Sequence, residues 1–213
     1  MALNMTSLAI KTLIEFIESD RTIEEASKHI TLELYKEFEC NKIKDLINNV
    51  TTYVNIVSSY YNEILSKKKY VSNTYIMTIK TPLLVHTHNP YMPINIGLSW
   101  HPIFNLPYIP STTIKGVLNR YLLDEKDLII LDSFPVSCKF RLIVPQVITP
   151  HYVNEFSEHK INPTPLIFPA IAPGVGFNLT IFSKKKIEKE NINKALFYGL
   201  GAKTSIGYGV VEI

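Results

Sequence analysis

The first 66 residues carry apolar side chains at the three- and four-residue spacings of amphipathic helices. Helices are predicted within residues 7–18 and 22–38, the second opened by Thr22 with Glu25 three residues later, a capping-box pattern. A longer helix is predicted over "NKIKDLINNVTTYVNIVSSYYNEIL", whose apolar stripe comprises Ile43, Leu46, Ile47, Val50, Tyr53, Val54, Val57, Tyr60, Tyr61 and Ile64. This stripe must be covered by the rest of the chain or by a partner, and most amphipathic helices pack on their own domain.

The apolar period changes to two after the lysine run 67–69. In "YIMTIK", Tyr75, Met77 and Ile79 share one side, which predicts a half-buried strand. Residues 90–110 contain five prolines, which exclude a helix or central strand and predict a long loop of the kind that often faces a partner. "YIPSTTIKGVLNRYLL" then predicts a helix with Ser111 as N-cap and a buried stripe of Ile114, Val117, Leu118 and Tyr121.

Further strands are predicted at about 128–132, 139–148 and 166–182, the last broken by the turn "APGVG". A helix around 188–198 and a final strand in "YGVVEI" follow. This order matches an α+β, ferredoxin-like (RRM-like) sandwich with an extra β-hairpin. A doubly wound parallel sheet fits less well, because the connections between the middle strands are too short for crossover helices. We therefore expect a helical N-terminal region, 1–70, and an α+β domain, 71–213, that ends in a glycine-rich loop.

Composition and charge narrow the class of protein. With 46% hydrophobic and 19% charged residues the chain reads as globular. Charged residues interrupt "LAIKTLIEFIE" at every turn, so we expect a cytoplasmic protein without a signal peptide, membrane span or membrane partner. Residues 1–66 hold six Lys or Arg against ten Asp or Glu, whereas residues 67–213 hold sixteen against nine. A polyanion would therefore bind the C-terminal two thirds of the chain.

The two cysteines, Cys40 and Cys138, lie far apart in the sequence and belong to no Cys-x-x-Cys pair. We expect neither a disulfide framework nor a zinc site from them, and a structural role for both.

The segment "YGLGAKTSIGYG" resembles a rearranged phosphate loop. A Walker loop requires Gly-Lys-Ser/Thr between a strand and a helix, but here Ala202 separates Gly201 from Lys203 and a helix precedes the segment. ATP binding is therefore excluded. The glycines, the Lys203 ammonium and the Thr204 hydroxyl suit close approach to a sugar-phosphate chain, and exposed amides there can form an anion-binding nest. The alternative is that the glycines only permit tight helix-to-strand packing.

A second anion site is predicted at "PSTTIKG". The free amides of the first helical turn, with Thr112 and Thr113, point at whatever lies ahead of the helix, where the helix dipole favours an anion. Lys115 lies at the edge of the buried stripe, within reach of the same region. Gly116 costs about 1 kcal/mol relative to alanine, which indicates close approach of another backbone. The alternative is an ordinary helix cap.

Taken together, "PYIPSTTIKGVLNRYL", "VITPHY", "NPTPLIFPAIAPGVGFNLTI" and "GLGAKTSIGYGVVEI" resemble the RAMP superfamily of CRISPR-associated proteins. Within it, the set is most similar to the family of the sixth subunit of the Cmr (type III-B) effector complex. The resemblance covers about residues 75–213. The family usually reads Ile-Pro-Gly-Ser-Ser-Leu-Lys-Gly where this chain has Ser111, Thr112 and Thr113 before Ile114 and Lys115, so the entry turn of the helix can differ.

The resemblance implies a non-catalytic RNA-binding subunit without cofactor or metal. Such a subunit contacts the 3′ part of the guide RNA (crRNA), caps the filament of backbone subunits and meets target RNA only indirectly, while a neighbouring subunit cuts the target. Its partners are the crRNA and the other Cmr subunits. The residues expected to bind RNA are Ser111, Thr112, Thr113, Lys115, Gly116, Arg120, His151, Gly199, Gly201, Lys203, Thr204, Ser205, Gly207 and Tyr208.

Two alternatives stay open. Some RAMP proteins are endoribonucleases that process precursor crRNA by acid/base chemistry, which needs a His or Tyr near the glycine loop. His151 is the best candidate, followed by His86, His88 and His101; His86 and His88 would share a strand face, but no third metal ligand accompanies them. The other alternative is a pure assembly scaffold whose working surface is the helical N-terminal region.

Overall fold

A computed structural model describes residues 4–121, 127–149 and 165–213 of the chain. Three helices come first: α1 (Met5–Glu18), α2 (Ile23–Glu37) and α3 (Lys44–Ser66). The capping box at the start of α2 is confirmed, because Thr22 Oγ1 accepts from the Glu25 N–H at 3.2 Å and Glu25 Oε2 accepts from the Thr22 N–H at 3.3 Å. Among the described residues, no helix is both long and apolar enough to cross a membrane.

The main sheet is antiparallel and has the strand order β4-β8-β1-β9. Its strands are β1 (Val71–Ile79), β4 (Ile129–Ile130), β8 (Gly176–Ser183) and β9 (Val211–Glu212), and a short fifth strand, β5 (Pro135–Ser137), also pairs with β8. Two helices interrupt the strands in sequence, α4 (Ser111–Tyr121) and α5 (Lys189–Phe197). The predicted α+β class is confirmed, and the helix predicted at 188–198 is confirmed as α5.

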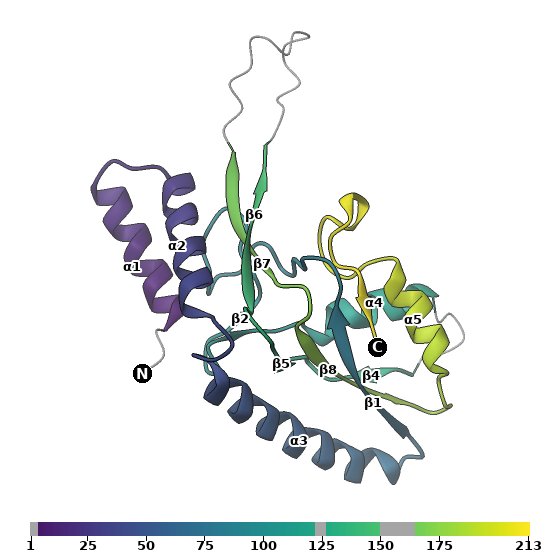
Figure 1. Cartoon of the computed structure of the whole chain (residues 1–213). Coiled ribbons are helices and arrows are strands. Elements are labelled where there is room, and N and C mark those ends of the chain that lie inside the picture. Colours follow the sequence, from purple (N-terminus) through teal and green to yellow (C-terminus); the bar gives the residue numbers. More distant parts are fainter. Residues whose placement is uncertain (1–3, 122–126, 150–164) are drawn as a thin grey trace, which may run out of the picture.

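The sheet lies between helices (Figure 1). The long helix α3 runs beneath it, whereas α4 and α5 pack together on its other side, close to the C-terminal loop drawn in yellow. In β1 the predicted alternation is confirmed, since Met77 and Ile79 are fully buried, whereas Ile76, which precedes Met77 and points to the other face, is 58% exposed. Strand β8 is buried along its whole length because its partners and both helical layers surround it.

The predicted extra hairpin forms a separate two-stranded sheet of β6 (Ile143–Ile148) and β7 (Leu166–Ile171). Its base packs against α2, and its strands lead away from the rest of the molecule (Figure 1). His151, in "TPHY", lies outside the described residues.

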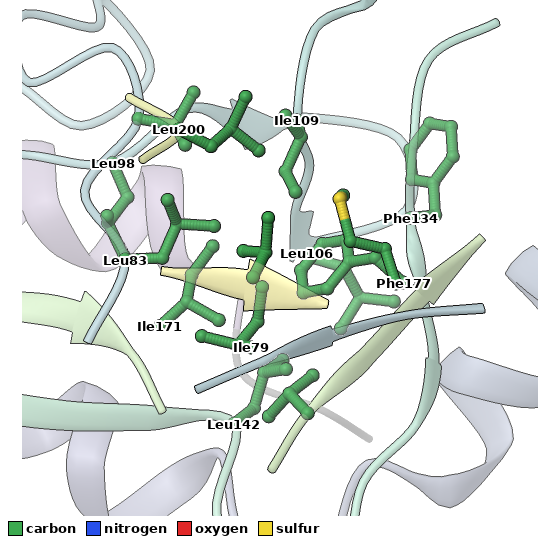
Figure 2. Close-up of a cluster of buried hydrophobic side chains, with 14 of the residues drawn as sticks. Ile79, Leu83, Leu98, Leu106, Ile109, Phe134, Leu142, Ile171, Phe177 and Leu200 are labelled. Carbon is green, nitrogen blue, oxygen red and sulfur yellow. The ribbon is translucent and has the colours of Figure 1, made fainter. Parts of the chain in front are cut away.

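The proline-rich segment is built into the core. It contains the short strands β2 (Trp100–His101) and β3 (Leu106–Pro107), and Leu98, Trp100 and Leu106 are fully buried. Trp100 Nε1–H donates to Asn105 Oδ1 at 3.2 Å. Figure 2 shows side chains of this segment converging on those of β1 and β8. Its apolar residues fill the space beside the sheet, and whether the segment also faces a partner stays a prediction.

The expectation that no disulfide would form is wrong. Cys40 and Cys138 are joined, with their Cα atoms 5.6 Å apart. An isolated antiparallel bridge between Glu39 and Arg141 aligns the two segments, and the Arg141–Glu39 ion pair at 2.9 Å reinforces it. The two cysteines are 98 residues apart in the sequence, so no local pattern predicted that they would be close. Tertiary pairing of the segments around them brings them together.

Helix α3 buries only part of its predicted stripe. Ile43, Val50 and Val54 join a single cluster of buried apolar side chains that extends from α1 to β9, so this part of the stripe packs on its own chain. Towards the C-terminal end of the stripe, Tyr60, Tyr61 and Ile64 are 61%, 39% and 38% exposed. The division into a helical region, 1–70, and a domain, 71–213, stays a prediction.

Candidate nucleic-acid interface

Helix α4 begins one residue earlier than predicted. Ser111 is its first helical residue, and the Pro110 carbonyl accepts the N–H of Ile114 at 3.4 Å, so Pro110 is the N-cap. Ser111 cannot cap the helix with its side chain from this position. Its N–H instead donates to Asp132 Oδ1 at 2.7 Å. Because a carboxylate already complements the positive end of the helix, the axial approach of a phosphate is blocked at Ser111.

Ser111 lines a hollow between α3 and the sheet, so it does not belong to the outer surface of α4. The hollow has a volume of about 500 Å³, is lined mainly by aromatic and aliphatic side chains, and includes Asp132 and His101. His101 stacks on Phe104 at 4.7 Å between ring centroids, and burial lowers its pKa, opposed by the Asp132 charge. These are features of a packed histidine.

The outer surface of α4 presents the remaining residues of the predicted site. Thr112, Lys115 and Arg120 are exposed. A Cβ added at Gly116 would meet no protein atom within 4 Å. No backbone of the described chain therefore requires glycine there, and the helix surface at Gly116 is open to a ligand. The predicted stripe is confirmed for Ile114 and Leu118, but Tyr121 is 37% exposed and was wrongly placed in it.

The glycine-rich loop adopts the left-handed backbone that its composition predicts, with positive φ at Gly199, Gly201, Gly207 and Gly209. Its first and last parts pack closely on the protein. A Cβ at Gly201 would lie 2.1 Å from the Leu84 carbonyl oxygen. A Cβ at Gly209 would lie 2.0 Å from the Leu200 carbonyl oxygen. For these two residues the packing explanation is sufficient.

Most amides of the loop are already engaged, so a nest of free N–H groups is not formed as predicted. Backbone carbonyls accept from the N–H groups of Gly199, Leu200, Ala202, Ile206, Gly207, Tyr208 and Gly209. The groups that remain for a ligand are side chains at the outer turn, a 3₁₀ helix over Thr204–Ile206 that follows Lys203. There Ser205 and Gly207 are exposed, while Lys203 and Thr204 are half-buried.

Lys203 has a backbone φ of +60°, the left-handed conformation that glycine adopts most readily. A lysine in this conformation carries a backbone cost of about 1–2 kcal/mol. Its side chain takes part in no ion pair among the described residues. Left-handed strain at a lysine outside the ion pairs of the described residues motivates a functional hypothesis for its ammonium.

Segment 82–86 brings the two predicted elements together. The carbonyls of Pro82 and Leu84 accept from the glycine loop, at 3.0 Å from Gly209 N and 2.8 Å from Ala202 N. Two residues later, His86 Nε2 lies 3.3 Å from Thr113 Oγ1 on α4. The start of α4 and the glycine loop therefore flank one short segment on the same side of the sheet (Figure 1).

Tyr208 is a structural member of the loop. Its O–H donates to Gln146 Oε1 of β6 at 3.0 Å, which ties the loop to the hairpin, and burial raises its pKa. A phenol with a raised pKa that is engaged in this way is a poor general base at neutral pH.

The other histidines do not form the strand face that was expected. His86 has φ of +51° and His88 contacts Thr87, both in irregular backbone. Within residues 4–121, 127–149 and 165–213, no three His, Cys, Asp or Glu side chains are grouped so as to hold a metal ion.

Comparison with known proteins agrees with the motifs. No protein-family model matches the chain. The CRISPR system Cmr subunit Cmr6 of Saccharolobus solfataricus is 28% identical over 252 aligned residues, which cover 100% of this chain and 89% of the relative. The chain resembles Cmr6. This confirms the similarity to the sixth Cmr subunit that the motifs indicated, and extends it to the helical N-terminal region.

The chain also resembles a solved Cmr structure in its three-dimensional fold. A chain in the cryo-EM structure of the type III-B Cmr-beta bound to cognate target RNA superposes with a TM-score of 0.69 at 28% identity, covering 87% of this chain and 70% of that chain. The crystal structure of Cmr6 from Pyrococcus furiosus aligns at 16% identity with a TM-score of 0.43, over 68% of this chain and 98% of that one. This second alignment adds nothing to the resemblance to Cmr6.

Sequence reasoning missed two features of the interface. Asp132, which occupies the start of α4, lies in no recognisable motif. The stacked pair of Tyr121 and Tyr198 could have been sought as aromatic residues beside the basic glycine loop, but the helical spacing of Tyr121 favoured burial.

Proposed function

We propose that this Cmr6-like chain is a subunit of a type III-B Cmr complex and binds the guide RNA by its sugar-phosphate backbone. The support is the resemblance to a Cmr subunit over the full chain and to a chain of a complex bound to target RNA. The observation that carries the proposal is the convergence of α4 and the glycine loop on segment 82–86, each with a lysine side chain outside the described ion pairs, Lys115 and Lys203.

The geometry defines how the RNA approaches. Asp132 closes the end of α4, so the backbone lies along the outer surface of the helix, past Thr112, Lys115 and the open position at Gly116. Lys203 and the hydroxyls of the 3₁₀ turn hold the next phosphates. Contacts of this kind fix register and orientation but read no bases, as a protein that accepts any spacer requires.

The domain that presents these residues is ferredoxin-like in our proposal. Its support is the chain order β1-α4-β4-β8-α5-β9 combined with the sheet order β4-β8-β1-β9, in which each helix connects two strands that are not neighbours. In our proposal the chain contacts the 3′ part of the crRNA and caps the end of the backbone filament. Target RNA is met only indirectly.

The subunit binds RNA without cutting it in this proposal. The interface combines lysines, hydroxyls and backbone, and Tyr208 is engaged with Gln146. Incubation of the purified chain with repeat RNA tests this point directly. Intact RNA is expected, whereas cleavage that is lost in His151→Ala would establish an endoribonuclease instead.

The binding surface is tested by the salt dependence of RNA affinity. Lys115→Ala and Lys203→Ala should each weaken binding evenly across RNA sequences and lower the slope of log K against log salt by about 0.7, the value for one phosphate of a single strand. Lys28→Ala is the matched control, because Lys28 is an exposed lysine on α2, and helix α2 lies on the opposite side of the molecule from α4 and α5 (Figure 1). If all three variants keep the salt slope of the unmodified chain, neither Lys115 nor Lys203 contacts a phosphate. Copurification with Cmr subunits without RNA crosslinks would favour a scaffold.

A further inference from the structure

Three exposed aromatic side chains gather where α4 and α5 end, next to the glycine loop. The rings of Tyr121 and Tyr198 are stacked, with centroids 4.3 Å apart and an interplanar angle of 5°. Phe197 meets Tyr198 edge-on at 6.2 Å. We refer to these three residues as the aromatic platform.

The platform is open to solvent. Tyr121 is 37% exposed, Tyr198 62% and Phe197 72%. The stack holds the tyrosine rings in a defined plane, which lowers the entropy that a planar ligand must overcome to bind them. Because exposed apolar surface is costly in water, a cluster of exposed aromatic rings beside charged residues is a candidate binding site.

Basic residues that are close in sequence to the platform indicate the class of ligand. Arg120 precedes Tyr121, Lys194 lies in the last turn of α5 and Lys203 follows in the loop. None of the three takes part in the ion pairs that the described residues form. Cations interleaved with exposed aromatic rings favour a polyanion that also carries planar groups, the chemistry of single-stranded nucleic acid.

We propose that the aromatic platform stacks a base of single-stranded RNA while the neighbouring cations hold its phosphates. The inference rests on the proposed function and deepens it by assigning a second kind of contact. Stacking is compatible with a guide of any sequence, since every base has an aromatic face. The platform thus adds affinity without adding sequence specificity.

The test compares RNA with a backbone that lacks bases. Dissociation constants of the full chain are measured by fluorescence anisotropy for an unstructured RNA and for an abasic strand of the same length. Tyr198→Ala should weaken binding of the RNA by about 5- to 150-fold, the range for loss of one stacked base, without changing the salt slope. Binding of the abasic strand should not change.

Two further variants separate stacking from folding and from apolar area. Tyr198→Phe should bind RNA like the unmodified chain, whereas Tyr198→Leu keeps apolar volume without a flat face and should bind as weakly as Tyr198→Ala. Thermal melting confirms that each variant is folded. Unchanged RNA affinity in Tyr198→Ala, or equal losses on the RNA and the abasic strand, would overturn the platform and leave the proposed function standing. If the unmodified chain binds neither strand, both proposals fail.

Discussion

Lys203→Gly should stabilise the fold and weaken RNA binding, two effects with opposite consequences for the protein. Lys203 has φ of +60°, where an L-residue pays about 1–2 kcal/mol. Glycine relieves this cost but adds about 0.5–1 kcal/mol of backbone entropy to the unfolded chain. The net gain in the free energy of unfolding lies between about 0 and 1.5 kcal/mol, and its midpoint of about 0.75 kcal/mol raises the melting temperature by roughly 2–3 °C in a chain of this size.

The effect on RNA is the loss of one phosphate contact. The slope of log K against log salt should fall by about 0.7, as for any removal of a single lysine from a single-stranded RNA site. Lys203→Ala is the matched control, because it removes the same ammonium and retains a Cβ in the left-handed conformation. It should reproduce the loss of RNA affinity without the gain in stability.

Calorimetry and anisotropy measurements on the same samples decide between the explanations. If Lys203→Gly melts at a lower temperature than the unmodified chain, the backbone of this turn is not left-handed in solution. If it is more stable but keeps the full salt slope, the strained lysine serves some purpose other than phosphate binding. Either result would refute the reasoning that connects strain at Lys203 with function.

Three further predictions concern the scaffold. Replacing Cys40 and Cys138 by alanine opens a loop of 98 residues and should lower the free energy of unfolding by up to about 4.7 kcal/mol, so denaturant midpoints that do not move would refute the disulfide. Burial lowers the pKa of His101 from 6.5, so the free energy of unfolding should decrease as pH falls from 6.5 through the folded pKa; His101→Asn should remove this slope, and a persistent slope would assign it to another group. Gly201→Ala, which meets a carbonyl oxygen at 2.1 Å, should destabilise by at least about 1 kcal/mol more than Gly207→Ala, which meets no atom, and equal melting temperatures would contradict the close packing.

Local patterns predicted most elements of the fold. Hydrophobic spacing located the helices, and the two-residue alternation around Met77 and Ile79 located β1, because both are set by neighbours in sequence. The disulfide and the burial of the proline-rich segment escaped prediction. Each depends on contacts between residues far apart in the chain, such as the bridge between Glu39 and Arg141, which no local pattern encodes.

The candidate site was predictable in position but not in chemistry. The motifs identified α4 and the glycine loop, and segment 82–86 brings them together. Spacing could not reveal that Asp132 would occupy the helix end or that loop amides would pair with internal carbonyls. In the proposed interface the RNA is therefore bound by side chains rather than by free backbone donors, and this shifts emphasis to Lys115 and Lys203.

Photocrosslinking tests the central claim most directly. The chain is assembled with the other Cmr subunits on a guide RNA that carries 4-thiouridine in its 3′ part, irradiated, digested and sequenced by mass spectrometry. The account predicts crosslinks in peptides that contain residues 111–121 and 197–208, with none in α1 or α2. Crosslinks confined to the N-terminal helices, or an assembled complex in which neither predicted peptide is crosslinked, would contradict it.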